Sequence, residues 1–67
     1  MTIDEIETGM IVNDRLGTAW EVKAVCKTNC THPHILVDAV DPHIFDGAVS
    51  VSATFRERAL QGFQPGE

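Results

Sequence analysis

The sequence predicts a small, mainly β domain, in which a curled sheet or barrel of four to five short strands is followed by a short C-terminal helix. Three observations lead to this prediction. Short segments of β-branched and apolar residues alternate with turn residues at close intervals. Apolar residues make up 43% of the 67 residues, a normal share for a globular protein. No internal repeat or linker divides the chain, so residues 1–67 are expected to form one domain.

The first half of the chain predicts a helical turn and then a hairpin. Residues 2–5 fit a capping box, in which a threonine hydroxyl and a glutamate carboxylate each satisfy a backbone donor. The apolar segment 10–12 and the alternating segment that begins at Thr18 flank a run of Asn, Asp and Gly, which is typical of a hairpin connection. A break in the alternation at Val25 indicates a bulge that bends the second strand.

The second half of the chain predicts two further strands and the closing helix. Residues 35–40 are apolar on both faces, which favours a central strand. Residues 49–55 follow an Asp-Gly turn dipeptide and alternate between apolar and polar types, as a half-buried strand does. Apolar residues at helical spacing over 55–63, with Thr54 as a capping residue, predict the helix. Residues 64–67 are expected to fray.

A glycine-led strand, a loop and a long bent strand follow one another at Gly9-Met10-Ile11-Val12, Asp14, Gly17, Trp20, Val22 and Val25. This succession resembles the opening of many small Src-homology-3-like β-barrels. The resemblance covers about residues 9–25; it implies a fold and transfers no active site. Families with this architecture include peptide binders, readers of modified lysine, and domains that attach to nucleic acid or ribosomes. With one Trp, three Phe and no Tyr, the chain offers little for a polyproline groove or a methyl-lysine cage.

The charge balance argues against polyanions and membranes as partners. Ten acidic and five basic residues give a formal net charge of −5, which opposes attraction to a phosphate backbone or an anionic lipid surface. No apolar run approaches the roughly 20 residues that a membrane-spanning helix needs. The acidic start of the chain also differs from the basic start of a signal peptide, so a cytoplasmic location is expected.

Four residues carry ligand atoms that zinc prefers: Cys26, Cys30, His32 and His34. If residues 30–34 are extended, three of these side chains share one face, and Cys26 can fold back as the fourth ligand of a structural zinc. The alternative is a buried Cys26 beside a polar loop that holds no metal. A disulfide between the cysteines would close only a small loop and stabilise little, so reduced thiols and no cofactor are expected.

The sequence favours a binding function over catalysis. No catalytic motif surrounds its serines and histidines, and so short a chain leaves little apolar surface for a water-excluding pocket, so we expect no enzyme. Ile44 and Phe45 lie in a predicted loop, where they either anchor a partner or fold inward over an open end of the barrel. The first hypothesis is an accessory module that binds another protein or a second copy of itself. A zinc-stabilised domain and a nucleic-acid-associated barrel are the alternatives.

Overall fold

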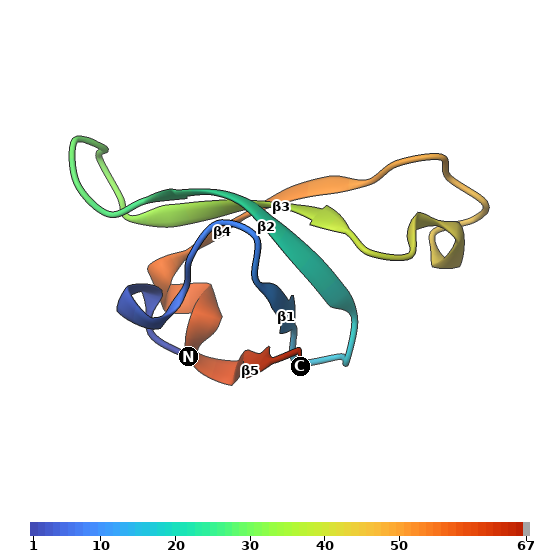
Figure 1. The fold of residues 1–67 in the computed structure, drawn as a ribbon, viewed down its shortest axis with the longest axis horizontal. Helices are drawn as coiled ribbons and strands as arrows, with labels where there is room; N and C mark the ends of the chain where they lie inside the picture. The colour runs from blue at the N-terminus through green and yellow to red at the C-terminus, as the bar shows by residue number, and fades with distance from the viewer. Residues whose placement is uncertain (67) are drawn as a thin grey trace.

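The computed structural model describes residues 1–66, and these form one open antiparallel sheet with short 3-10 helices (Figure 1). The strands are β1 (Ile11–Asn13), β2 (Ala19–Cys26), β3 (His34–Ala39), β4 (Ser52–Arg56) and β5 (Gln64–Pro65). The 3-10 helices are η1 (Ile3–Glu5), η2 (Pro42–Ile44) and η3 (Glu57–Gly62). The strand order is β4-β3-β2-β1-β5, so β4 and β5 form the two edges. The prediction of a mainly β domain with a curled sheet is confirmed.

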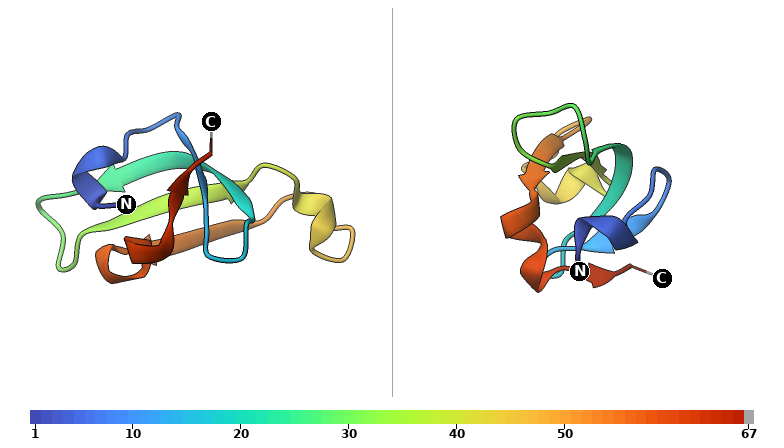
Figure 2. Two further views of the ribbon diagram at one scale, coloured as in Figure 1. Left: turned by 90° about the horizontal axis from the view of Figure 1, so that it is seen from below. Right: turned by 90° about the vertical axis from the view of Figure 1, so that its left-hand side faces the viewer.

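The sheet curls because β2 is long and bent (Figure 2). Its first residues pair with β1 on one side, while nearly its whole length pairs with β3 on the other. The pairing with β3 shifts register between Val22 and Ala24, which confirms the predicted bulge. A bulge increases the local twist of a strand, so the two ends of β2 run in different directions and the sheet folds over its own apolar face.

The core lies on the concave face of the curled sheet, and η1 and η3 cover it. The buried apolar side chains are Ile3, Ile6, Val12, Trp20, Val22, Ile35, Val37, Leu60 and Phe63. The two ends of the chain meet there, because the Met1 amine donates hydrogen bonds to the carbonyls of Leu60 and Phe63 at 3.0 and 3.1 Å. Within residues 1–66, no helix combines the length and the apolar character that crossing a membrane requires.

Asp14 organises the loop between β1 and β2. Its carboxylate accepts hydrogen bonds from the backbone amides of Leu16 and Thr18, each at 2.9 Å, and from the Trp20 indole nitrogen at 3.1 Å. Burial raises the pKa of Asp14, but these hydrogen bonds, first among them the one from Trp20, outweigh burial and leave the pKa below its ordinary value. The ionised carboxylate therefore fixes the hairpin loop and the orientation of the buried tryptophan at once.

The N-terminal turn forms as the sequence predicts. The Glu5 carboxylate accepts hydrogen bonds from the Thr2 amide and from the Thr2 hydroxyl, each at 3.0 Å. The hydrogen bond from the Thr2 amide, and after it the hydrogen bond from the Thr2 hydroxyl, lowers the pKa of Glu5. This capping box holds η1 in the orientation that buries Ile3.

The C-terminal third differs from the prediction in three places. Strand β4 begins at Ser52 rather than at residue 49, because β3 ends at Ala39 and provides no pairing partner further out. The strand then continues to Arg56, so Thr54 is a strand residue and not a helix cap. Phe55 and Phe63 do not share a helix face. Phe55 lies in β4 and Phe63 follows η3, and their rings pack edge to face with centroids 5.0 Å apart.

The expectation that residues 64–67 fray is wrong for the residues that the structure describes. Gln64–Pro65 pairs with β1, and the Gly66 amide donates to the Ile11 carbonyl at 2.8 Å. The open edge of β1 offers backbone groups that would otherwise be unpaired, so it orders the tail as β5. Glu67, the last residue of that prediction, lies outside the described residues.

Candidate functional site

The connection between β3 and β4, residues 40–51, projects from one end of the sheet, and we name it the apolar arm (Figure 1). Four large apolar side chains of this arm are exposed: Val40 at 51%, Ile44 at 59%, Phe45 at 37% and Val49 at 90%. Sequence reasoning singled out only two of the four, Ile44 and Phe45. The alternating pattern of residues 49–55 predicts that Val49 faces the core. The structure differs because β3 ends at Ala39 and is too short to pair with residue 49.

Ile44 and Phe45 were predicted either to anchor a partner or to fold inward over the core, and the structure places one residue in each position. The Phe45 ring packs at 5.8 Å and 45° from the ring of Trp20, so Phe45 partly covers the end of the core. Ile44 extends into solvent. The same contact that covers Trp20 also fastens the arm to the body of the domain. One residue of the predicted pair therefore supports the arm, and its neighbour presents an apolar surface.

Local turns give the arm a defined shape. The Asp41 carboxylate accepts a hydrogen bond from the His43 amide at 3.3 Å and begins η2. Asp46 and Gly47 both adopt left-handed backbone conformations, with φ of 57° and 73°. The chain reverses there, and the Gly47 amide donates to the His43 carbonyl at 3.1 Å. An Asp-Gly pair suits this reversal because Asp tolerates the left-handed region and Gly adopts it freely.

The arm is acidic as well as apolar. Asp41 and Asp46 are exposed on it, and residues 40–51 contain no Lys or Arg. Asp38 lies at the base of the arm. It forms the last residue pair between β3 and β4 with Ser52, and it accepts a hydrogen bond from the Ser52 hydroxyl at 2.6 Å. The arm therefore combines apolar contact groups with a rim of negative charge.

The loop that joins β2 to β3, residues 27–33, lies at the opposite end of the sheet from the apolar arm (Figure 2). Cys26 ends β2, and Cys30 lies in this loop. Cys26 and Cys30 form a disulfide, so the expectation of reduced thiols is wrong in this structure. The physical reason is the loop conformation. Asn29 has a φ of 59°, which turns the chain back and brings the Cα atoms of the two cysteines to 6.5 Å, within the range that a disulfide spans.

Three of the four predicted metal ligands lie together. Ligand atoms of Cys26, Cys30 and His34 are within 4.8 Å of one another, and all three residues are partly buried. His34 is directly opposite Cys26 in the pairing of β2 with β3. We name these three residues the Cys-His cluster.

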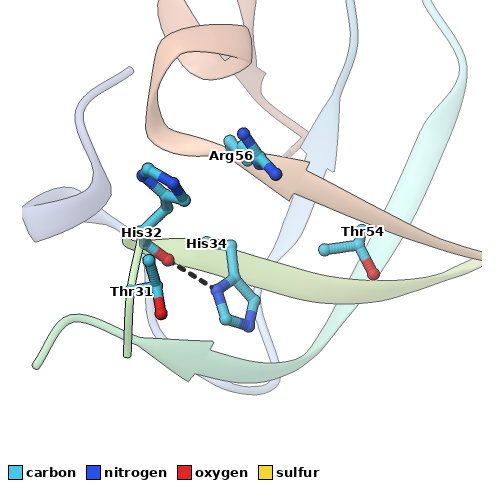
Figure 3. Close-up of a pocket in the computed structure, with 5 residues that line it drawn as sticks. All are labelled: Thr31, His32, His34, Thr54 and Arg56. Atoms are coloured by element: carbon cyan, nitrogen blue, oxygen red, sulfur yellow. Dashed lines mark hydrogen bonds between the residues drawn. The ribbon is translucent and has the colours of Figure 1, made fainter. Parts of the chain in front are cut away.

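The fourth predicted ligand, His32, is not part of the cluster, and its ring lies on the opposite side of the chain from the ring of His34 (Figure 3). The strand begins only at His34, so the two-residue period that would place both histidines on one face does not extend back into the loop. His32 turns toward Arg56 instead, while its carbonyl oxygen lies 2.8 Å from Nδ1 of His34. The two histidines therefore differ. The His34 ring belongs to the cluster, whereas His32 contributes only its backbone carbonyl, which contacts that ring.

A shallow groove of about 330 Å³ separates the two histidines, and its lining residues are Thr31, His32, His34, Thr54 and Arg56 (Figure 3). A neighbouring groove shares His32 and Arg56 and adds Arg58. Arg56 and Arg58, two of the five basic residues of this acidic chain, thus lie beside His32, together with Glu57. Their positions in sequence gave no signal for this, because the grouping depends on how the loop before β3 folds over β4.

No family model, curated protein or solved structure matches this chain.

Proposed function

We propose that this protein is a non-enzymatic interaction module that binds another protein through its apolar arm. The observation that carries this proposal is the exposure of four large apolar side chains on one projecting connection. Single exposed apolar residues are common on soluble proteins, whereas several on one connection mark surfaces that a partner covers.

The shape of the arm favours binding as well as its composition. The contact between Phe45 and Trp20 and the turn at residues 46–47 hold the arm in one conformation before a partner arrives. A surface that is already ordered loses less conformational entropy on binding, so more of its contact free energy contributes to affinity. Ile44 and Val49 are the anchors that this arrangement presents, and Phe45 supports them.

The charge of the arm indicates the chemistry of the partner. Asp41 and Asp46 flank the exposed apolar groups. A complementary surface has an apolar pocket with Lys or Arg side chains at its rim, because opposite charges across an interface accelerate association and exclude wrong partners. Pairing of two arms in a homodimer would bring the aspartates of both copies together, and the repulsion between like charges disfavours it. We therefore propose a different protein, rather than a second copy, as the partner.

The resemblance to small Src-homology-3-like barrels is part of this proposal, and local structure supports it. Gly9, with a φ of 95°, leads into β1, a tight loop follows, and β2 is long and bent by its bulge. Domains of this kind commonly serve as binding modules. The binding surface proposed for this chain is the arm rather than an aromatic groove.

The test compares an arm variant with a matched control. The double variant Ile44→Ser, Val49→Ser removes both anchors, and Leu16→Ser alters an equally exposed apolar residue of the β1–β2 loop. Each purified protein is immobilised and exposed to an extract of the source cells, and retained proteins are quantified by mass spectrometry. We expect a protein that the wild type and Leu16→Ser retain to be lost, by about tenfold or more, from the double variant.

Two results would contradict the proposal. If the double variant retains the same proteins as the wild type, the arm is not the binding surface. If sedimentation shows that the wild type is a dimer and the double variant a monomer, the occupant of the arm is a second copy. Circular dichroism and thermal melting of each variant establish that the fold is intact, since both anchor side chains are exposed and their truncation is expected to cost less than about 0.5 kcal/mol.

A further inference from the structure

We propose that Cys26, Cys30 and His34 form a redox-gated zinc site, which binds the metal when the cysteines are reduced and excludes it when they form their disulfide. The proposal concerns the end of the domain opposite the apolar arm and does not depend on the interaction function. It differs from the four-ligand set that the sequence predicts, because His32 is not a ligand.

The ligand atoms of the Cys-His cluster already lie close to the separations that zinc requires. They lie within 4.8 Å of one another in the disulfide form. Around a tetrahedral zinc, with Zn–S of about 2.3 Å and Zn–N of about 2.0 Å, neighbouring sulfurs are about 3.8 Å apart, and sulfur and nitrogen about 3.5 Å. Reduction lets the two sulfurs separate to that distance, and closing the remaining gap of at most about 1.3 Å, the difference between 4.8 Å and about 3.5 Å, brings the His34 ring into range.

The contact between the His34 ring and the His32 carbonyl fixes which ring nitrogen is free to bind a metal. Nδ1 of His34 lies 2.8 Å from the His32 carbonyl oxygen, which accepts hydrogen bonds and cannot donate them. This contact requires a proton on Nδ1 and leaves the lone pair of the neutral imidazole on Nε2. Histidines that ligate zinc commonly donate their other ring N–H to a backbone carbonyl in this way, which fixes the tautomer that binds metal.

Two of the three ligands lie on paired strands, so most of the site is rigid. Cys26 and His34 are paired residues of β2 and β3, so the strand register fixes the spacing of their backbones. Cys30 alone lies in the loop, and the turn at Asn29 carries it back toward the strands. Exchange between disulfide and metal site therefore asks for movement of one loop, with the sheet unchanged.

The switch consists of two steps, reduction of the disulfide and binding of zinc. A dithiol reductant transfers two electrons and two protons to the disulfide, giving two cysteine thiols while the reductant becomes a disulfide. Zinc then displaces both thiol protons and binds two thiolates and the neutral imidazole. Two thiolates cancel the charge of Zn²⁺, so the occupied site is neutral and avoids repulsion with Arg56, which pairs with His34 across the sheet. Water occupies the fourth position.

Partial burial of the cluster allows both directions of the switch. The two cysteines are neither fully enclosed nor fully exposed, so a reductant reaches the disulfide from solvent. A reducing compartment keeps such pairs as thiols, and an oxidising one closes them. The metal content of this domain is thus expected to follow the redox state of its surroundings.

The test uses cobalt(II) as a spectroscopic substitute for zinc with the full chain. Protein reduced by a phosphine, which binds cobalt poorly, is titrated with Co²⁺ without oxygen, and thiolate-to-cobalt charge-transfer absorption is recorded. We expect absorption that saturates at one equivalent, disappears when Zn²⁺ is added, and is absent from the disulfide form. Absence of the band in the reduced wild type, or an equal band in the disulfide form, overturns the proposal.

Matched variants test which histidine binds. His34→Gln is expected to weaken cobalt binding by about tenfold or more, whereas His32→Gln keeps the backbone carbonyl and is expected to bind as the wild type does. Equal loss in both variants, or loss in His32→Gln alone, refutes the three-residue assignment. A second measurement covers any variant that folds poorly: Zn²⁺ is expected to protect both cysteines of the reduced wild type from alkylation by iodoacetamide, and unchanged alkylation contradicts the site.

Discussion

Truncation of Phe45 to alanine tests whether this residue supports the arm rather than contacting the partner. About a third of the side chain is exposed, at 37%, and the rest packs against the domain, including the Trp20 ring. A fully buried phenylalanine loses about 3–5 kcal/mol on truncation to alanine. Scaled to the buried share of about two thirds, the expected loss for Phe45→Ala is about 2–3 kcal/mol. In a domain of this size, this corresponds to a fall in Tm of about 10–20 °C.

The assay is urea unfolding of the disulfide form, followed by far-ultraviolet circular dichroism so that the altered environment of Trp20 does not affect the signal. Val49→Ala is the matched control, because Val49 is 90% exposed and its truncation is expected to change the free energy of unfolding by less than about 0.5 kcal/mol. If Phe45→Ala is no less stable than Val49→Ala, the packing of Phe45 on Trp20 does not hold the arm, and the division of roles within the arm is wrong.

Three further predictions concern the body of the domain. Asp14→Asn is expected to cost about 1 kcal/mol near neutral pH. Because the folded pKa of Asp14 is lowered, the wild-type advantage is present above the ordinary pKa of the carboxyl group and is lost as the pH falls through the folded pKa, so the urea midpoints of the two proteins should approach each other as the pH is lowered into the acid range. Gly66→Ala places a Cβ 2.6 Å from a methyl group of Ile11 and 2.8 Å from its carbonyl oxygen, and a loss of about 1–2 kcal/mol in urea unfolding is expected if β5 pairs as described. Reduction of the disulfide between Cys26 and Cys30 opens a very short loop, so thermal melting should show a folded protein that has lost no more than about 2 kcal/mol.

The sequence predicts the sheet well wherever local chemistry decides the structure. The bulge in β2 and the turn after β1 follow from residue type and spacing, and the structure contains both. The capping box at Thr2 and Glu5 is also local, and it forms. These features depend on residues a few positions apart, so one segment carries all the information needed.

The errors occur where a distant partner decides. Val49 continues the alternation of β4 toward its N-terminal side. Because β3 ends at Ala39, no strand lies beside residue 49, so Val49 is exposed. Residues 64–66 have the composition of a loose tail and are ordered by the free edge of β1, more than 50 positions away in the chain. Neither the length of β3 nor the open edge of β1 can be read from the segment concerned.

The candidate sites show the same division. The spacing of Cys26, Cys30 and His34 predicts a metal cluster; the pairing of β2 with β3 places Cys26 opposite His34, and the turn at Asn29 brings Cys30 to them. The exclusion of His32 could not be predicted, because it depends on where β3 begins. The disulfide depends on the left-handed turn at Asn29, which the sequence permits without requiring.

The most direct test of the central claim is site-specific photo-crosslinking from the apolar arm. Benzoylphenylalanine is introduced at position 49, and separately at position 16 as a control of equal exposure in another loop. The protein is irradiated in an extract of the source cells and crosslinked species are identified by mass spectrometry. We predict a crosslink from position 49 to one other protein, with no such product from position 16. Identical products from both positions, or none from position 49, would contradict the assignment of the arm as the binding surface.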